Sequence, residues 1–143
     1  MEKEERGQIS TEYLIIVGFI MFLIISILGF SLFYSDQIRD RVKLNQLQNF
    51  ANKLVSSAEQ VFYSGEPSKT TITAYLPSGV QSITIPPAPN NKEIIFSIQT
   101  SSGLTIISFS SNVPIGSSSL SNNEGVKRIV VTAGATEVGL AEG

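Results

Sequence analysis

The sequence predicts an α+β protein with one long N-terminal hydrophobic α-helix followed by a small antiparallel β-sheet domain. Two observations carry this prediction. The 22 residues from Tyr13 to Tyr34 contain no charged side chain. From Lys69 onward, Thr, Ser, Val and Ile alternate in short runs separated by clusters of Pro, Gly and Asn, which is typical of β-strands and turns. The length of 143 residues fits one domain beyond the helix.

The composition argues against several classes of function. The formal net charge is −2 and the pI is about 5.1, so we expect no basic surface that attracts nucleic acid. The chain has no histidine and no cysteine, which removes the commonest general base, the commonest metal ligand and any disulfide. We therefore expect no enzyme, no catalytic or metal site, no cofactor and no nucleic-acid partner.

The apolar run is long enough to cross a membrane. As a helix it would extend about 33 Å at 1.5 Å per residue, against a hydrocarbon core of roughly 30 Å. A secretory signal has a shorter apolar stretch of about 7–15 residues that ends at an Ala-x-Ala-like site, and neither feature occurs here. We expect the run to stay on the mature chain as a membrane-spanning helix.

Beyond Tyr34 the apolar residues thin out to a stripe with helical spacing, so we expect the same helix to continue. Ser64-Gly65-Glu66-Pro67 is the first stop signal, because glycine caps helix C-termini and proline cannot resume the helix. The predicted helix covers residues 8–64. Its stripe consists of Ile38, Val42, Leu47, Phe50, Leu54, Ala58 and Val61, widened by Leu44, Ala51, Val55 and Phe62.

A β domain is expected over residues 65–143. Pro77-Ser78-Gly79 and Ser101-Ser102-Gly103 lie between neighbouring strands and predict two antiparallel hairpins. Alternation predicts a sheet with one packed face, for which the helix stripe is the expected partner. Residues 86–91 and 111–124 are expected to be surface loops. The predicted strands are Thr70–Leu76, Val80–Ile85, Glu93–Thr100, Leu104–Ser110 and Val126–Ala133, with a weaker one near Thr136–Leu140.

A short charged segment precedes the apolar helix. Residues 1–7 read Met-Glu-Lys-Glu-Glu-Arg-Gly, and Gln8-Ile9-Ser10-Thr11-Glu12-Tyr13-Leu14 follows. This arrangement closely resembles the class III signal peptide of archaeal type IV pilin-like precursors, in which a Gln-x-Ser-x-Glu-Tyr-Leu-type sequence follows a glycine. The resemblance implies that residues 1–7 are a leader which a prepilin peptidase removes between Gly7 and Gln8. The processing motif is then Gln8, Ser10, Glu12, Tyr13 and Leu14.

The resemblance also implies a function. The chain would be a structural subunit of an archaeal type IV-like pilus, an extracellular adhesion filament assembled by helical packing of the N-terminal helices. Residues 8–64 would span the membrane in the precursor and form the filament core after assembly, while residues 65–143 would lie on the filament surface. The implied partners are further copies in a helical homopolymer, the prepilin peptidase, a pilus assembly ATPase and a membrane platform.

Two alternatives to a filament subunit remain open at the level of sequence. One is a minor pilin-like protein, or a single-pass membrane-anchored extracellular binding domain, that does not polymerise. The other is an ectoenzyme, which the absence of histidine and cysteine disfavours.

Glu12 and Gln8 form the predicted assembly pair. By resemblance, Glu12 would be the fifth residue of the mature chain and would meet the free amino group of Gln8 from a neighbouring subunit in a poorly solvated core. The alternative is local, because a negative charge near the helix N-terminus suits the helix dipole and Ser10 can cap the helix. Gly18 and Gly29 could let neighbouring helices approach closely, but glycine is also common in membrane helices. The sequence favours these two interpretations equally.

Overall fold

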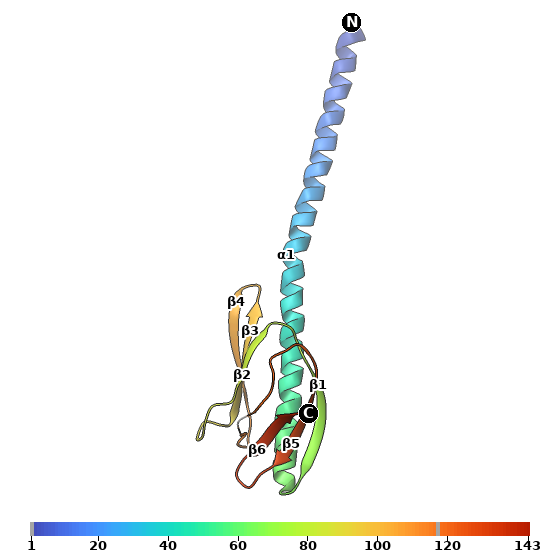
Figure 1. The fold of residues 1–143 in the computed structure, drawn as a ribbon. Helices are drawn as coiled ribbons and strands as arrows, with labels where there is room; N and C mark the ends of the chain where they lie inside the picture. Colours follow the sequence, from blue (N-terminus) through green and yellow to red (C-terminus); the bar gives the residue numbers. More distant parts are fainter. Residues whose placement is uncertain (1, 117) are drawn as a thin grey trace. The chain divides into compact units, whose positions relative to one another are not determined.

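The computed structural model describes residues 2–116 and 118–143, with side chains from Thr11 onward within these ranges. The chain divides into two compact units, one ending at Arg39 and the other running from Asp40 to Gly143. The predicted fold class is confirmed. One long helix, α1 (Glu2–Ser64), is followed by two three-stranded antiparallel sheets (Figure 1).

The helix ends where the sequence predicts. Ser64 is its last residue, and Gly65 follows with a φ of 75°. Glycine adopts this left-handed conformation without a Cβ clash, which makes it the preferred residue just beyond a helix C-terminus. The Gly65 backbone N–H donates to the Phe62 carbonyl at 3.0 Å, which satisfies one carbonyl of the last turn.

The six strands form two separate sheets, both in the second unit. The first has the order β1-β5-β6 and the second the order β2-β3-β4, with every pair antiparallel. All six predicted strands are present. Strand Glu93–Thr100 has the predicted bounds, and the other five have shifted ends, the weakest beginning at Val138 rather than Thr136. Their bounds are β1 (Lys69–Leu76), β2 (Val80–Thr84), β3 (Glu93–Thr100), β4 (Gly103–Ser110), β5 (Gly125–Ala133) and β6 (Val138–Glu142).

One of the two predicted hairpins is correct. Thr100 pairs with Gly103 across the short turn between β3 and β4, as expected. The hairpin predicted at Pro77-Ser78-Gly79 is wrong, because β1 pairs with β5 and β2 pairs with β3. β1 finds eight register partners along β5, whereas β2 is only five residues long. The longer ladder pairs more backbone groups of β1.

The turn after β1 instead carries the chain from one sheet to the other. Gly79 has a φ of 90°, and its carbonyl accepts a hydrogen bond from the Gln99 backbone N–H at 2.8 Å. A Cβ at this position would lie 3.0 Å from the Gln99 carbonyl oxygen. Both the dihedral angle and the close approach of β3 therefore require glycine here.

The core of the second unit lies between the helix stripe and the inner faces of both sheets. Phe50 on α1 packs edge-on against Phe96 on β3, so the stripe is the partner of the packed sheet face, as expected. Ile38 and Val42 belong to the predicted stripe but are exposed, at 61% and 48%. The fully buried part of the stripe begins at Leu47.

The expectation that residues 111–124 form a surface loop is wrong for the first part of that segment. Val113 and Ile115 are 1% and 0% exposed and belong to the core. Ile115 forms a parallel bridge with Val138, and its N–H donates to the Asn91 carbonyl at 2.8 Å. Segment 111–116 therefore lies against β6, because two alternating apolar side chains draw it inward.

Candidate assembly surface

The most prominent surface feature of the first unit is its apolar helix. Every residue from Tyr13 to Tyr34 except Ser26 is exposed, including Phe19, Phe22 and Phe30 at 61%, 65% and 68%. Among the described residues, one helix is long and apolar enough to cross a membrane, by length and composition, with a mean hydropathy of 2.8 in its apolar window. Covering a large apolar side chain stabilises by roughly 1.5–3 kcal/mol. This helix could therefore anchor the chain in a membrane.

The one hydroxyl near the middle of the apolar run is satisfied within the helix. Ser26 Oγ donates to the Phe22 carbonyl at 2.8 Å. This bond leaves no unpaired hydroxyl hydrogen facing an apolar environment, where an unsatisfied polar group is costly. Ser26 is therefore compatible with lipid and with a packed helix bundle alike.

The two glycines of the apolar run have no packing role inside the chain. A Cβ placed on Gly18 or Gly29 would meet no atom within 4 Å. At Gly29 the missing side chain leaves a shallow groove of about 470 Å³, lined by Ile25, Ser26, Phe30 and Phe33. Such a groove lets a neighbouring helix approach closely.

The predicted site residues follow one another along α1. Glu12 is exposed, and Tyr13 and Leu14, at 70% and 69% exposed, begin the apolar surface. The predicted cleavage residues Gly7 and Gln8 lie within α1, whose side chains are described only from Thr11 onward. The expectation that Ser10 caps the helix is wrong, because α1 already begins at Glu2. The amino group expected to meet Glu12 would come from another copy of the chain.

Three side chains of α1 fasten the second unit together. Asp40 Oδ2 accepts hydrogen bonds from the Ser101 hydroxyl and, at 2.9 Å, from the Ser101 backbone N–H. These two bonds, the hydroxyl bond being the stronger influence, hold the pKa of Asp40 below its usual value. Asp40 therefore fixes the tip of the β3–β4 hairpin on the helix.

The other two contacts attach α1 to separate segments. Glu59 Oε1 accepts from the Asn112 backbone N–H at 2.9 Å and from Asn112 Nδ2 at 2.8 Å. Lys53 Nζ donates to the Thr73 carbonyl on β1 at 2.7 Å. No local sequence pattern signals these contacts, because the partners lie 53 and 20 residues apart.

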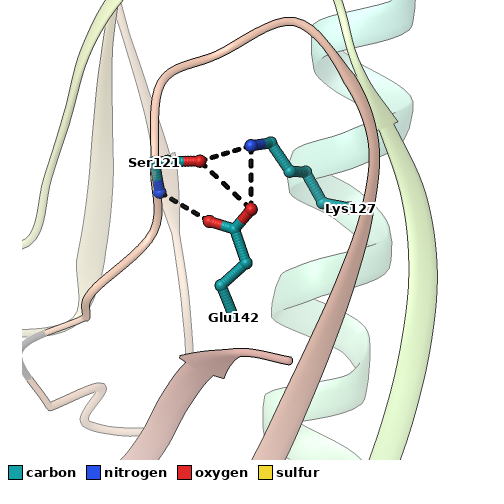
Figure 2. A network of polar contacts seen from close by, with 3 residues as sticks. All are labelled: Ser121, Lys127 and Glu142. Atoms are coloured by element: carbon teal, nitrogen blue, oxygen red, sulfur yellow. Dashed lines mark hydrogen bonds and ion pairs between the residues drawn. The ribbon is translucent and has the colours of Figure 1, made fainter.

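A polar network of Ser121, Lys127 and Glu142 joins the loop before β5 to strands β5 and β6, as Figure 2 shows. Lys127 on β5 forms an ion pair of 2.8 Å with Glu142 on β6, and the lysine also donates to the Ser121 hydroxyl. Ser121 in turn donates to Glu142 through its backbone N–H at 2.8 Å and its hydroxyl at 3.1 Å. The network holds the loop before β5 against the last strand.

The same network makes the carboxyl group of Glu142 more acidic. The hydrogen bond from Lys127, followed by those from the Ser121 backbone and hydroxyl, lowers the pKa of Glu142 to about 2. The Lys127 side chain that forms the ion pair is only 10% exposed. Its Nζ donates to both Ser121 and Glu142, which links the loop before β5 to both strands.

The grooves of the second unit bring together few reactive groups. One of about 400 Å³ between α1 and β1 is lined by Lys53 and Tyr75 among others, and one of about 170 Å³ near residues 85–91 contains Glu137. Across the described residues, no three His, Cys, Asp or Glu side chains lie close enough to share a metal ion. The exposed apolar helix is thus the strongest functional candidate in the part of the chain that the structure describes.

Comparison with known proteins found no match for this chain among protein families, curated proteins or solved structures.

Proposed function

We propose that this chain is a structural subunit of an archaeal type IV-like pilus, an extracellular adhesion filament in which the N-terminal helices of many copies form the core. The observation that carries the proposal is the exposed apolar helix from Tyr13 to Tyr34, directly preceded by the Gly7–Gln8 sequence and Glu12. A folded unit of two small sheets follows on the same chain.

In this function the apolar surface of the helix is covered first by lipid and then by protein. Before assembly, lipid covers the side chains of the helix. After a prepilin peptidase cuts between Gly7 and Gln8, an assembly ATPase and a membrane platform move the subunit into the filament, where neighbouring helices replace lipid. The exchange is feasible because both environments are apolar, and the Gly29 groove supports close helix packing.

The way in which the contact between neighbouring subunits repeats determines the type of assembly. In a helical filament each subunit makes head-to-tail contacts that do not close, so the polymer grows without a fixed number of copies. Glu12 would pair with the freed amino group of Gln8 on a neighbour and fix the axial register. The folded unit would lie on the outside, where its surface is available for adhesion.

A single-pass anchored protein that never polymerises, including a minor pilin-like component, is the competing proposal. The same apolar helix supports it, because lipid alone can cover that surface. Filaments sheared from cells that express the chain, viewed by electron microscopy and identified by mass spectrometry, separate the two. If the chain is a filament subunit, this polypeptide is the main component of the sheared filaments. If it is only a membrane-anchored protein, it remains in the membrane fraction.

A further inference from the structure

The two sheets of the second unit have four edge strands, β1, β6, β2 and β4. An edge strand presents a row of backbone N–H and C=O groups without a partner in its own sheet, and such a row can pair with a strand of another chain. Proteins usually protect these edges with charges, short strands, bulges or covering segments. The four edges of this chain differ in how they are protected.

The edges of β1 and β6 are covered by other parts of the chain. On β1, the Thr73 carbonyl accepts a hydrogen bond from Lys53 of α1 at 2.7 Å. On β6, the Val138 backbone N–H donates to the Pro114 carbonyl at 2.9 Å, and the Val138 carbonyl accepts from the Gly116 N–H at 2.8 Å. Both edges are therefore partly occupied.

The edge of β2 is interrupted. The strand has five residues, and its register with β3 shifts between Val80 and Ser82. Asn122 Nδ2 also donates to the Gln81 carbonyl at 2.7 Å. A short, irregular and partly bonded strand is a poor template for another chain.

The edge of β4 has none of these protections. β4 has eight residues that pair with β3 in an uninterrupted register, and its sequence contains neither a charged residue nor proline. The Ser111 N–H donates to the Lys92 carbonyl at 2.7 Å, so these two residues form a hydrogen-bonded pair. In an antiparallel ladder, hydrogen-bonded and non-hydrogen-bonded pairs alternate. Antiparallel alternation then directs the backbone groups of Leu104, Ile106, Ser108 and Ser110 to the open side.

The side chains of the same positions add an apolar surface. Leu104 and Ile106 are 59% and 67% exposed, although they lie next to each other on one face of β4. Within residues 2–116 and 118–143, no hydrogen bond from outside β3 reaches the backbone of these two residues. A partner strand would bond to the open groups and cover both side chains together.

We propose that β4 is a self-association edge, at which the β4 strands of two copies of this chain pair antiparallel about Ile106 and join two three-stranded sheets into one. The edge carries no charge, so two copies bring no like charges together, which would otherwise oppose cross-strand pairing. In this register the two Ile106 residues face each other, and each Leu104 faces a Ser108.

Such a contact is small. Two eight-residue strands bury less surface than the roughly 1,600 Å² of a standard stable interface, so a single pair is weak. The pairing is isologous and closes after two copies, so it does not build the filament core proposed above. Repeated along filaments, if the chain forms them, it would join neighbouring filaments laterally by avidity.

A cysteine scan of the full chain in detergent micelles tests the pairing. The chain has no cysteine, so Leu104→Cys, Ile106→Cys, Ser108→Cys and Ser110→Cys each introduce a single thiol. Directly opposed residues in a bonded antiparallel pair have Cα atoms about 5.5 Å apart, within the disulfide range of about 4.4–6.8 Å. Each step of two residues from the centre adds about 13 Å between symmetry-related positions, so only one position can react efficiently.

The matched control is Val126→Cys, because Val126 is 70% exposed but lies on the central strand β5. We expect Ile106→Cys to form disulfide-linked dimers at least about tenfold faster than Val126→Cys under mild oxidation, since pairing raises the effective thiol concentration. Equal rates at both positions, or a maximum at any other residue of the scan, would overturn the proposed pairing.

Charge variants test whether the β4 edge pairs with a second copy of the chain. Ile106→Lys should lower the fraction of dimer at least about tenfold, while Val126→Lys should leave it unchanged. If the scan shows no dimer at any of the four positions, the β4 strands do not pair and the proposal is wrong, whatever the patch contacts in its place. In cells, Ile106→Lys should preserve single filaments and remove lateral bundles. The absence of filaments from wild-type cells would contradict the proposed function and leave the micelle result as the test of the pairing.

Discussion

The ring of Phe50 on α1 meets the ring of Phe96 on β3 edge-on, with centroids 6.1 Å apart and an interplanar angle of 89°. Both side chains are almost completely buried, at 2% and 0% exposed. The contact joins a helix to a strand more than forty positions further along the chain, so it forms only when the second unit is folded.

Replacing Phe96 with Ala should lower the free energy of unfolding of the second unit by about 3–5 kcal/mol, because a large core side chain is removed and a cavity remains. Denaturant titration of the full chain in detergent micelles measures the change. Val126→Ala on an exposed site should change the same quantity by less than about 0.5 kcal/mol. Phe50→Leu and Phe96→Leu should be coupled by about 0.5–1.5 kcal/mol in a double-mutant cycle, and additive effects would contradict a direct ring contact.

The Lys127–Glu142 pair predicts a pH dependence of stability. The folded-state pKa of Glu142 is about 2, below its ordinary value of 4.5, so the pair contributes stability above about pH 4.5 that is lost as the pH falls towards 2. Glu142→Gln should lower the free energy of unfolding at neutral pH by about 1–3 kcal/mol, and the difference from wild type should shrink across this acid range. Thermal unfolding at a series of pH values measures both effects.

The control for that series is Glu66→Gln. Glu66 is an exposed carboxylate, so the same chemical change there should alter neither the stability at neutral pH nor its acid dependence. Identical acid profiles for wild type and Glu142→Gln would show that the pair contributes nothing to stability.

The contact between Glu59 and Asn112 predicts a local effect. Glu59→Ala removes both hydrogen bonds to Asn112, so the segment that carries the buried Val113 and Ile115 should open more often. We expect a loss of about 1–2 kcal/mol in stability and faster amide hydrogen exchange in residues 111–116. Gln60→Ala, one position further on the exposed side of the helix, is the matched control and should change neither.

A Glu12 variant tests the proposed pairing of Glu12 with Gln8 separately from the cleavage of the leader. We expect the Glu12→Ala precursor to be cut at Gly7–Gln8 but to assemble at least about a hundredfold less well, because removing one partner of a poorly solvated ion pair costs about 3–5 kcal/mol. Mass spectrometry of the processed chain and filament counts by electron microscopy measure the two steps. Normal assembly of Glu12→Ala would favour a helix-dipole role, and Glu66→Ala should have no effect on either step.

Much of the fold could be predicted because its signals are local. The apolar run, the Gly65 stop and the alternation along β3 each depend on neighbouring residues, and each element was located within a few positions. The same is true of the β3–β4 hairpin, whose two strands are joined by a short turn.

The pairing of β1 could not be predicted in this way. A turn at Pro77-Ser78-Gly79 is compatible both with a hairpin and with a crossing between sheets, and the choice depends on β5, about fifty residues further on. The same limit applies to the contacts of Asp40 and Glu59 with distant loops. Val113 and Ile115 lie in a polar segment, which predicts a surface loop, whereas their burial depends on the position of β6.

In the proposed function, the apolar helix remains on a subunit cut at Gly7–Gln8 and packs into a filament. The most direct test is the N-terminal residue of this polypeptide in sheared surface filaments, determined by mass spectrometry, with the membrane fraction measured in parallel. We expect filaments built from chains that begin at Gln8, and a Gly7→Val precursor that stays uncut in the membrane. Chains that begin at Met1 and occur only in the membrane fraction of wild-type cells would contradict it.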